Sequence, residues 1–140
     1  MLDLGAPIVI TMDGIPAPKE RARKGARGQF YTPSKTRKRE NDLGWLAKGA
    51  MRGRPIITGP VSVTILAVFP VPASWSRAKQ AGALLGATHH TARPDADNVW
   101  KLATDAMNKI VFKDDAQACE VRVFKRYGEK PSLTIEVKEI

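Results

Sequence analysis

Apolar residues recur at every second position in three stretches of the chain, which is the period of a β-strand with one buried face. These stretches are Val61 to Phe69, Cys119 to Val123 and Leu133 to Val137. The first becomes apolar on both faces as it proceeds, so we expect it at the centre of a sheet. A shorter apolar run from Ile8 to Met12 predicts a fourth strand, and residues Tyr127 to Pro131 predict a hairpin loop between the last two strands.

Two segments carry apolar residues at steps of three and four, the period of a helix with one buried face. The first spans residues 33 to 52, between a Thr-Pro start signal and Gly53, and its apolar residues are Leu43, Leu46, Ala47 and Ala50. The second spans residues 98 to 109, and its apolar residues are Val99, Leu102, Ala103, Ala106 and Ile110. We expect Ser74 to cap a shorter helix over residues 75 to 85. A brief strand at residues 30 and 31 completes the pattern. The predicted fold class is α+β: a single compact domain over residues 1–140, with a mixed β-sheet of about four strands packed against two main α-helices.

The size and composition of the chain exclude several classes of protein. A chain of 140 residues is long enough for one core that folds without a stapling cofactor. The single cysteine, Cys119, excludes an internal disulfide and a multi-cysteine zinc site, which favours a reducing compartment. No apolar stretch reaches the ~18 residues that a membrane span needs. The expected protein is therefore cytoplasmic, with no membrane partner.

The net charge of +9 and the pI near 10.0 are typical of proteins that bind polyanions. Between Lys19 and Arg54 there are twelve basic and three acidic residues, a difference of nine, so this region holds the entire excess. Its loop and the first half of the following helix could track a phosphate backbone. The alternative is a solvated charged face. The residues that we expect to bind DNA are Lys19, Arg21, Arg23, Lys24, Arg27, Tyr31, Lys35, Arg37 and Lys38.

An acidic cluster elsewhere in the chain points to metal chemistry. Asp95 and Asp97 stand two positions apart after Pro94, and on extended backbone their carboxylates would project from the same side. Carboxylate pairs bind hard cations such as Mg²⁺ and Mn²⁺, together with substrate phosphate. Spacing alone leaves an ordinary alternative open, in which Asp97 caps a helix beginning at Asn98 and Asp95 is a solvated loop residue.

Three further charged residues could belong to the same site. Asp114-Asp115 follows the second helix, whose return could bring this turn back toward the sheet, although adjacent acids in a turn are usually solvated. Lys101 lies one helical turn after Asp97 and could stabilise charge on a phosphate. It could equally form only an i,i+4 ion pair with Asp97. Asp105 continues the same helix face and could support Lys101 or remain a surface acid.

Taken together, these motifs resemble the signature of the RusA family of Holliday-junction resolvases. The residues that carry the resemblance are Arg93-Pro-Asp-Ala-Asp-Asn98, Lys101, Asp105-Ala106 and Phe112-Lys-Asp-Asp-Ala-Gln117. Gly14-Ile-Pro-Ala-Pro-Lys19 and Phe30-Tyr-Thr-Pro-Ser-Lys-Thr36 are similar to the N-terminal pattern of the family, so the resemblance covers roughly residues 6 to 138. Ala96 and Ala22 depart from that pattern, because relatives often have a larger aliphatic residue and a proline there.

The resemblance implies a homodimeric, Mg²⁺-dependent endodeoxyribonuclease, with Mn²⁺ able to substitute and no small-molecule cofactor. Such an enzyme makes paired nicks in four-way (Holliday) junctions during DNA recombination and repair. Carried over to this sequence, the metal ligands are Asp95, Asp97 and Asp115, and Lys101 completes the catalytic group. Two alternatives remain: a non-catalytic nucleic-acid-binding module, which the basic region would serve equally well, and a metal nuclease for flaps, forks or RNA.

Overall fold

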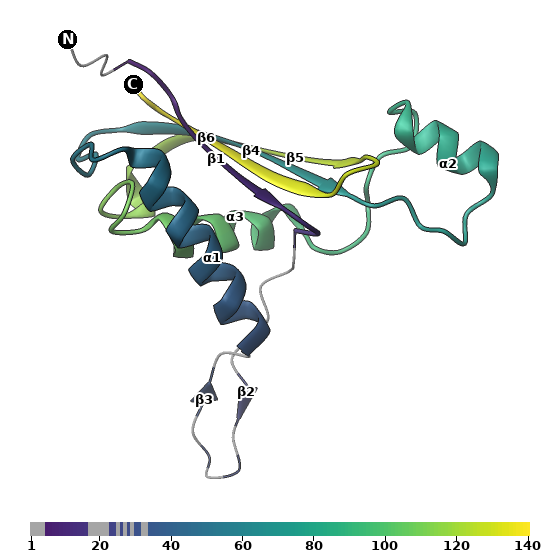
Figure 1. Cartoon of the computed structure of the whole chain (residues 1–140), viewed down its shortest axis with the longest axis horizontal. Helices are drawn as coiled ribbons and strands as arrows, with labels where there is room; N and C mark the ends of the chain where they lie inside the picture. The colour runs from purple at the N-terminus through teal and green to yellow at the C-terminus, as the bar shows by residue number, and fades with distance from the viewer. Residues whose placement is uncertain (1–4, 17–22, 25, 27, 29, 32–33) are drawn as a thin grey trace.

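Four strands form the sheet at the centre of the protein (Figure 1). The computed structural model describes residues 5–16, 23–24, 26, 28, 30–31 and 34–140. The strands are β1 (Ile8–Asp13), β4 (Val61–Phe69), β5 (Ala118–Tyr127) and β6 (Ser132–Glu139), and their order in the sheet is β1-β6-β4-β5. Strand β4 pairs antiparallel with β6 and parallel with β5, so the sheet is mixed and β4 is an interior strand, which confirms its predicted central position.

The predicted hairpin between β5 and β6 is wrong, because β4 lies between these two strands. Their connection instead crosses the end of β4, where the N–H of Gly128 donates to the carbonyl of Phe69 at 3.0 Å. The crossing is close: a Cβ atom added at Gly128 would lie 2.6 Å from Cγ1 of Val68. A residue with a side chain fits there only if the side chain of Val68 shifts.

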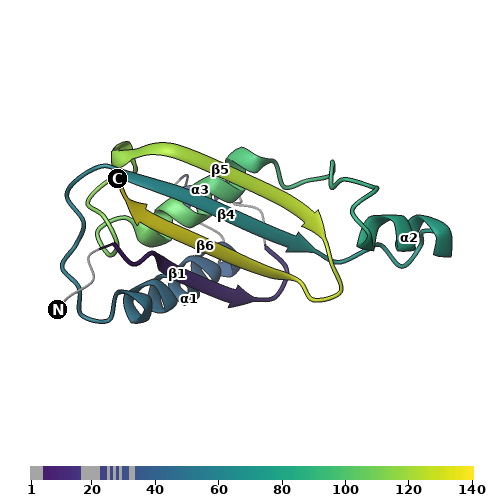
Figure 2. The same ribbon diagram turned by 90° about the horizontal axis from the view of Figure 1, so that it is seen from above.

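Helices α1 (Ser34–Met51) and α3 (Ala96–Met107) cover the same face of the sheet (Figures 1 and 2). Their apolar rows pack onto the inward residues of the strands and form one core. On α1 the buried row is Leu43, Ala47 and Met51, spaced by four, whereas Leu46, which we expected inside, is 42% exposed. The row at i, i+4 and i+8 is the face that meets β1 and α3, and Leu46 lies beside it. The α+β class with a single compact domain is confirmed.

Three smaller elements complete the described fold. Helix α2 (Arg77–Leu84) lies beyond the end of the sheet (Figure 2), and its N-cap is Ser76, two residues later than predicted. The Ser76 hydroxyl accepts a hydrogen bond from the N–H of Lys79 at 3.2 Å, which satisfies a first-turn donor. Strands β2 (Arg23–Lys24) and β3 (Phe30–Tyr31) pair antiparallel, so part of the predicted basic loop is a hairpin. A 3₁₀ turn, η1 (Asp115–Gln117), precedes β5.

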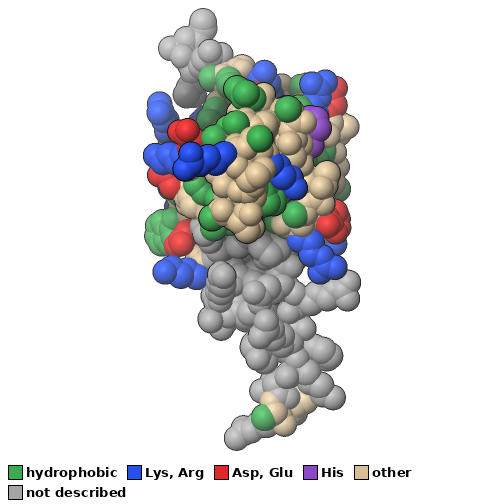
Figure 3. All heavy atoms as spheres, turned by 90° about the vertical axis from the view of Figure 1, so that its right-hand side faces the viewer, with side chains coloured by type: hydrophobic (Ala, Val, Ile, Leu, Met, Phe, Trp, Pro, Cys, Tyr) green, Lys and Arg blue, Asp and Glu red, His purple; other side chains and the backbone are tan. Residues whose placement is uncertain are grey.

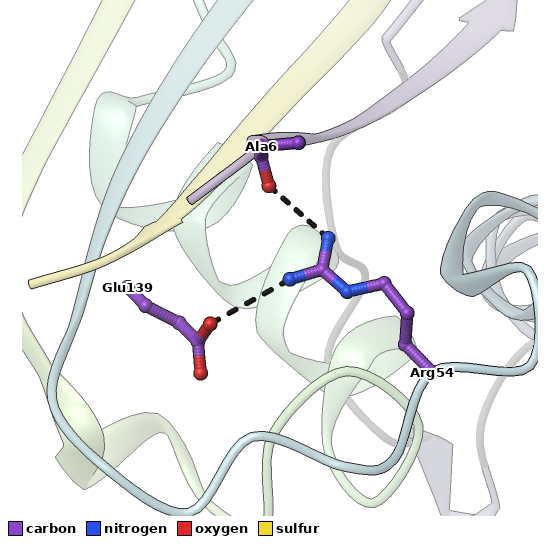
Figure 4. A network of polar contacts seen from close by, with 3 residues as sticks. All are labelled: Ala6, Arg54 and Glu139. Atoms are coloured by element: carbon purple, nitrogen blue, oxygen red, sulfur yellow. Dashed lines mark hydrogen bonds and ion pairs between the residues drawn. The ribbon is translucent and has the colours of Figure 1, made fainter. Parts of the chain in front are cut away.

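Arg54, in the connection from α1 to β4, links the segment before β1 to the end of β6 (Figure 4). Its guanidinium donates to the carbonyl of Ala6 at 3.1 Å and lies 3.6 Å from a carboxylate oxygen of Glu139. This residue belongs to the basic region of the sequence, yet its guanidinium contacts groups of the protein itself. Among the described residues, no helix is long and apolar enough to cross a bilayer.

Candidate active site

Helix α3 carries the central part of the candidate site, and its buried face fixes its orientation. That face packs into the core through Val99, Leu102, Ala103, Ala106 and Met107. The remaining surface therefore has to carry the charged residues, and Asp97, Lys101 and Asp105 follow one another along it at steps of four. With a rise of 1.5 Å per residue, Asp97 and Asp105 are separated by about 12 Å along the helix axis.

The two acids at the start of α3 lie on different backbone conformations. The helix begins at Ala96, two residues earlier than predicted, so Asp95 occupies the N-cap position with extended backbone while Asp97 is already helical. The expectation that both acids stand on an extended segment is therefore wrong, and so is the alternative in which Asp97 caps the helix. The Asp95 side chain makes no capping hydrogen bond. Both carboxylates lie at the positive end of the helix dipole, which stabilises negative charge there.

Lys101 forms the i,i+4 ion pair that its spacing predicts. Its Nζ atom lies 3.1 Å from Oδ2 of Asp97, and the two side chains are 53% and 68% exposed, respectively. A pair this exposed contributes only about 0.3 to 0.5 kcal/mol to stability. Its main consequence is that an ammonium group lies beside the acids at the start of α3.

The turn that carries Asp114 and Asp115 is fixed by Gln117, which sequence reasoning did not single out. Oε1 of Gln117 accepts from the N–H groups of Lys113 and Asp114 at 2.9 and 3.1 Å. Its Nε2 donates to the carbonyls of Ile57 and Gly59, both at 2.9 Å. One side chain thus closes the turn and ties it to a segment about 60 residues earlier in the chain. No local signal in the sequence identifies those distant carbonyl partners.

The two neighbouring acids of this turn have different roles. Asp114 is the N-cap of η1, and its Oδ2 accepts from the N–H of Ala116 at 3.2 Å. Asp115 is half-buried. Partial burial first, then a hydrogen bond with the Asp114 carboxyl and the negative charges of Asp114 and Asp105, raise the pKa of Asp115 above its ordinary value. The structure therefore brings Asp115 close to Asp105. Asp105 lies near the C-terminal end of α3, whereas Asp95 and Asp97 lie at its N-terminal end.

The acids fit a hard divalent cation in their chemistry, although they do not form a closed protein cage. Within the described ranges, no group of three His, Cys, Asp or Glu side chains is close enough to hold a metal ion by itself. Mg²⁺ is commonly held by one or two carboxylates, with water and substrate phosphates completing the shell. Asp95 and Asp97 offer such carboxylates at the start of α3, and Asp115 offers another beside Asp105 toward its other end.

The predicted DNA-binding residues are distributed over the hairpin and the first half of α1. Arg23 and Lys24 lie on β2, Tyr31 lies on β3, and Lys35, Arg37 and Lys38 lie on α1, where the Lys38 side chain is exposed. Lys19, Arg21 and Arg27 lie outside the described residues. At the other extremity, where α2 lies, Lys and Arg side chains are spread around the rim of the visible face with acids beside several of them (Figure 3).

Comparison with known proteins assigns this architecture to a family. The family model described as endodeoxyribonuclease RusA matches residues 13–138 of the chain. The chain therefore belongs to the RusA family. RusA membership makes it an endodeoxyribonuclease, with DNA as its substrate, and confirms the resemblance that the aspartate motifs carry. A relative at 33% identity is the uncharacterized protein YqaN of Bacillus subtilis (strain 168), aligned over 137 residues that cover 95% of this chain and 96% of the relative.

Proposed function

We propose that this RusA-family chain is a Mg²⁺-dependent, structure-specific endonuclease that resolves four-way DNA junctions by paired nicks, in recombination and repair. Mn²⁺ would substitute for Mg²⁺. A homodimer would place two such sites about a two-fold axis, which matches the approximate symmetry of a four-way junction. The cytoplasm is the compartment in which such an enzyme would meet DNA.

The observation that carries the proposal is the acidic face of α3 in a protein with a net charge of +9. An exposed acidic face repels phosphate, so a protein that only binds DNA gains nothing from it. A nuclease does gain, because a divalent cation between carboxylates and phosphate converts the repulsion into a bridge. Partial burial, followed by the neighbouring carboxyls of Asp114 and Asp105, raises the pKa of Asp115, so a cation bound beside this carboxylate would stabilise its ionised form.

In the proposed site, Asp95 and Asp97 at the start of α3, and Asp115 beside Asp105 toward its other end, hold one or two hydrated cations against the scissile phosphate. When bound, the metal supplies an activated water as the nucleophile and neutralises charge on the phosphate. Lys101, held 3.1 Å from Asp97, provides a positive charge beside the scissile phosphate. Gln117 is a positioning residue, because it fixes the turn that presents Asp115. The β2–β3 hairpin and the first half of α1 would bind the DNA arms.

The test is cleavage of a synthetic four-way junction, with Mg²⁺ or with a chelator, by the wild type, Asp97→Asn and Asp13→Asn. Asp13 is an exposed acid at the end of β1, so its variant controls for the loss of one negative charge. We expect paired, metal-dependent nicks from the wild type and from Asp13→Asn, and none from Asp97→Asn. Metal-dependent cutting that survives Asp97→Asn would refute the assigned site.

The same assay separates the alternative functions. A protein that binds the junction but does not cut it, whichever divalent metal is added, is a non-catalytic binding module. A protein that cuts flaps, forks or RNA more rapidly than junctions shares the catalytic group but acts on another substrate. Sedimentation of the free protein tests the proposed dimer independently of activity.

A further inference from the structure

A cleft of about 320 Å³ lies between α1 and the end of α3, next to the candidate active site. Asn41, Trp45 and Lys48 line it from α1, and Asp105 and Asn108 line it from the end of α3. Its volume is at the lower end of the ~300 to 1,000 Å³ range of small-molecule pockets. Asp105 is also one of the charges that act on Asp115, so the cleft and the acidic site share a wall.

The most exposed aromatic side chain of the described chain stands at this cleft. Trp45 is 74% exposed, although it lies on the same helix as the buried residues Leu43 and Ala47. Nζ of Lys48 lies 5.7 Å from the centroid of the Trp45 ring, within cation–π range. An exposed indole beside an ammonium group suits a nucleotide, because the ring can stack on a base and the cation can meet its phosphate.

The opposite wall offers a hydrogen-bond acceptor that the described chain does not use. The side-chain oxygen of Asn108 is buried and has no hydrogen-bond partner among the described residues. Buried acceptors are usually satisfied, and leaving one unpaired is unfavourable. A ligand that carries N–H donors would complete it when a rotation of the Asn108 side chain brings the oxygen to the cleft. Nucleobases carry such donors on their exocyclic amines and ring nitrogens, whereas a phosphate carries acceptors and would be repelled by the neighbouring Asp105 carboxylate.

We propose that this cleft receives one unstacked nucleobase of the DNA substrate, with Trp45 stacking on the base and Asn108 accepting a hydrogen bond from its edge. The inference rests on the proposed function only in that branched DNA is the substrate, since branch points present bases that are free to leave the stack. A base held there would fix the register of the strand relative to Asp115. Trp45 and Asn108 would then be specificity-determining residues of the nuclease.

The test uses a four-way junction with a fluorescent adenine analogue at the branch point, in chelator, so that binding is measured without cleavage. We expect the wild type to quench the analogue by stacking, and Trp45→Ala to lose the quenching and to bind the junction roughly 5- to 150-fold more weakly. Trp45→Phe should retain most of both effects. Leu85→Ala is the matched control, because Leu85 is an apolar side chain that is 86% exposed on the distant α2 end.

A second variant fills the cleft without removing the indole. A Cβ atom at Gly44 would sit 3.7 Å from both the carbonyl oxygen of Ala106 and Cδ1 of Ile110, which line the cleft, so the additional atoms of Gly44→Leu enter the space between α1 and the end of α3. Leucine is also a better helix former than glycine. Thermal unfolding shows whether Gly44→Leu folds, and Trp45→Ala alone decides the test if it does not. Gly44→Leu should abolish the quenching. Unchanged quenching and affinity in Trp45→Ala and Gly44→Leu would overturn the inference. A change of oligomeric state in these variants with the quenching intact would also overturn it, because this face would then be an interface between copies of the chain. Junction cleavage is scored separately, so an inactive wild type that still quenches would refute the proposed nuclease and leave the base site standing.

Discussion

The substitution Gln117→Ala tests whether one side chain holds the turn that carries Asp115 in place. Gln117 connects two parts of the chain through four hydrogen bonds, two that it accepts from the turn and two that it donates to the carbonyls of Ile57 and Gly59. Alanine removes all four and fills none of the vacated space. The turn that carries Asp115 then loses both side-chain hydrogen bonds to the segment before β4, while the backbone hydrogen bond from the N–H of Ile57 to the carbonyl of Val111, at 2.9 Å, remains next to it.

The expected cost follows from the number and setting of these bonds. A net contribution of about 0.5 to 1.5 kcal/mol per bond, with some of the freed groups reached by water, gives a loss of about 2 to 4 kcal/mol in unfolding free energy. An entropy of unfolding of about 2.1 cal/mol/K per residue then predicts a fall in Tm of about 7 to 14 °C for a 140-residue chain.

Urea and thermal unfolding of the wild type and Gln117→Ala measure this loss, and junction cleavage well below the lower Tm measures the effect on activity. Gln80→Ala is the control, because Gln80 also donates to two backbone carbonyls, at 2.8 and 3.4 Å, but does so beside α2. We expect Gln80→Ala to cost less stability and to leave cleavage unchanged. A Gln117→Ala protein within about 0.5 kcal/mol of the wild type, the range of ordinary surface changes, would refute the role assigned to Gln117.

Three further predictions concern other parts of the fold. Gly128→Ala should destabilise by about 1 to 3 kcal/mol, because its Cβ collides with the side chain of Val68 on β4. Gly49→Ala, inside α1 with open space around it, should stabilise by up to about 1 kcal/mol. Urea midpoints that fail to separate the two variants would contradict this. Burial and a nearby lysine lower the pKa of His90 below 6.5, so the unfolded state binds the proton more readily and stability should decrease as pH falls below about 6.5. His90→Phe should lose that part of the pH dependence, and an unchanged slope between pH 8 and 5 would count against it. Asp115→Asn should abolish cleavage. It should also slightly stabilise the metal-free protein at pH values above the ordinary pKa of the carboxyl, because the raised pKa means that the ionised form of Asp115 is disfavoured in the fold. A clear loss of stability would oppose the electrostatic account.

Periodicity in the sequence was sufficient to locate the sheet and the main helices. Burial on one face imposes a period of two on β4 and β6, and the buried row of α3 imposes steps of three and four. Element ends were less certain: α3 starts at Ala96 because Asp95 takes the N-cap position. Residue types that favour the start of a helix stand at several neighbouring positions, so the sequence alone does not decide at which of them the helix begins.

The contacts that the sequence could not predict are those between distant segments. The Gly-Glu-Lys-Pro connection at residues 128–131 suits a hairpin as well as it suits a crossing over β4, and strand order alone distinguishes them. Gln117 and Arg54 look like ordinary polar residues until the carbonyls and the carboxylate that they contact are known. Positive charge counted along the chain therefore overestimated the surface available for DNA, because Arg54 is used within the fold.

The acids of the candidate site come from two elements that are anchored independently, and this explains both what local sequence motifs reveal and what they omit. Asp97 is oriented by the buried face of α3, a property of its own helix. Asp115 is placed by Gln117 through backbone carbonyls that precede β4. Each acid is therefore visible as a motif, but the distance between them depends on the core and on the turn together. The proposed site is therefore sensitive to changes far from its carboxylates, because a shift of α3 against the segment at residues 57–59 alters the distances between these acids without changing any of them.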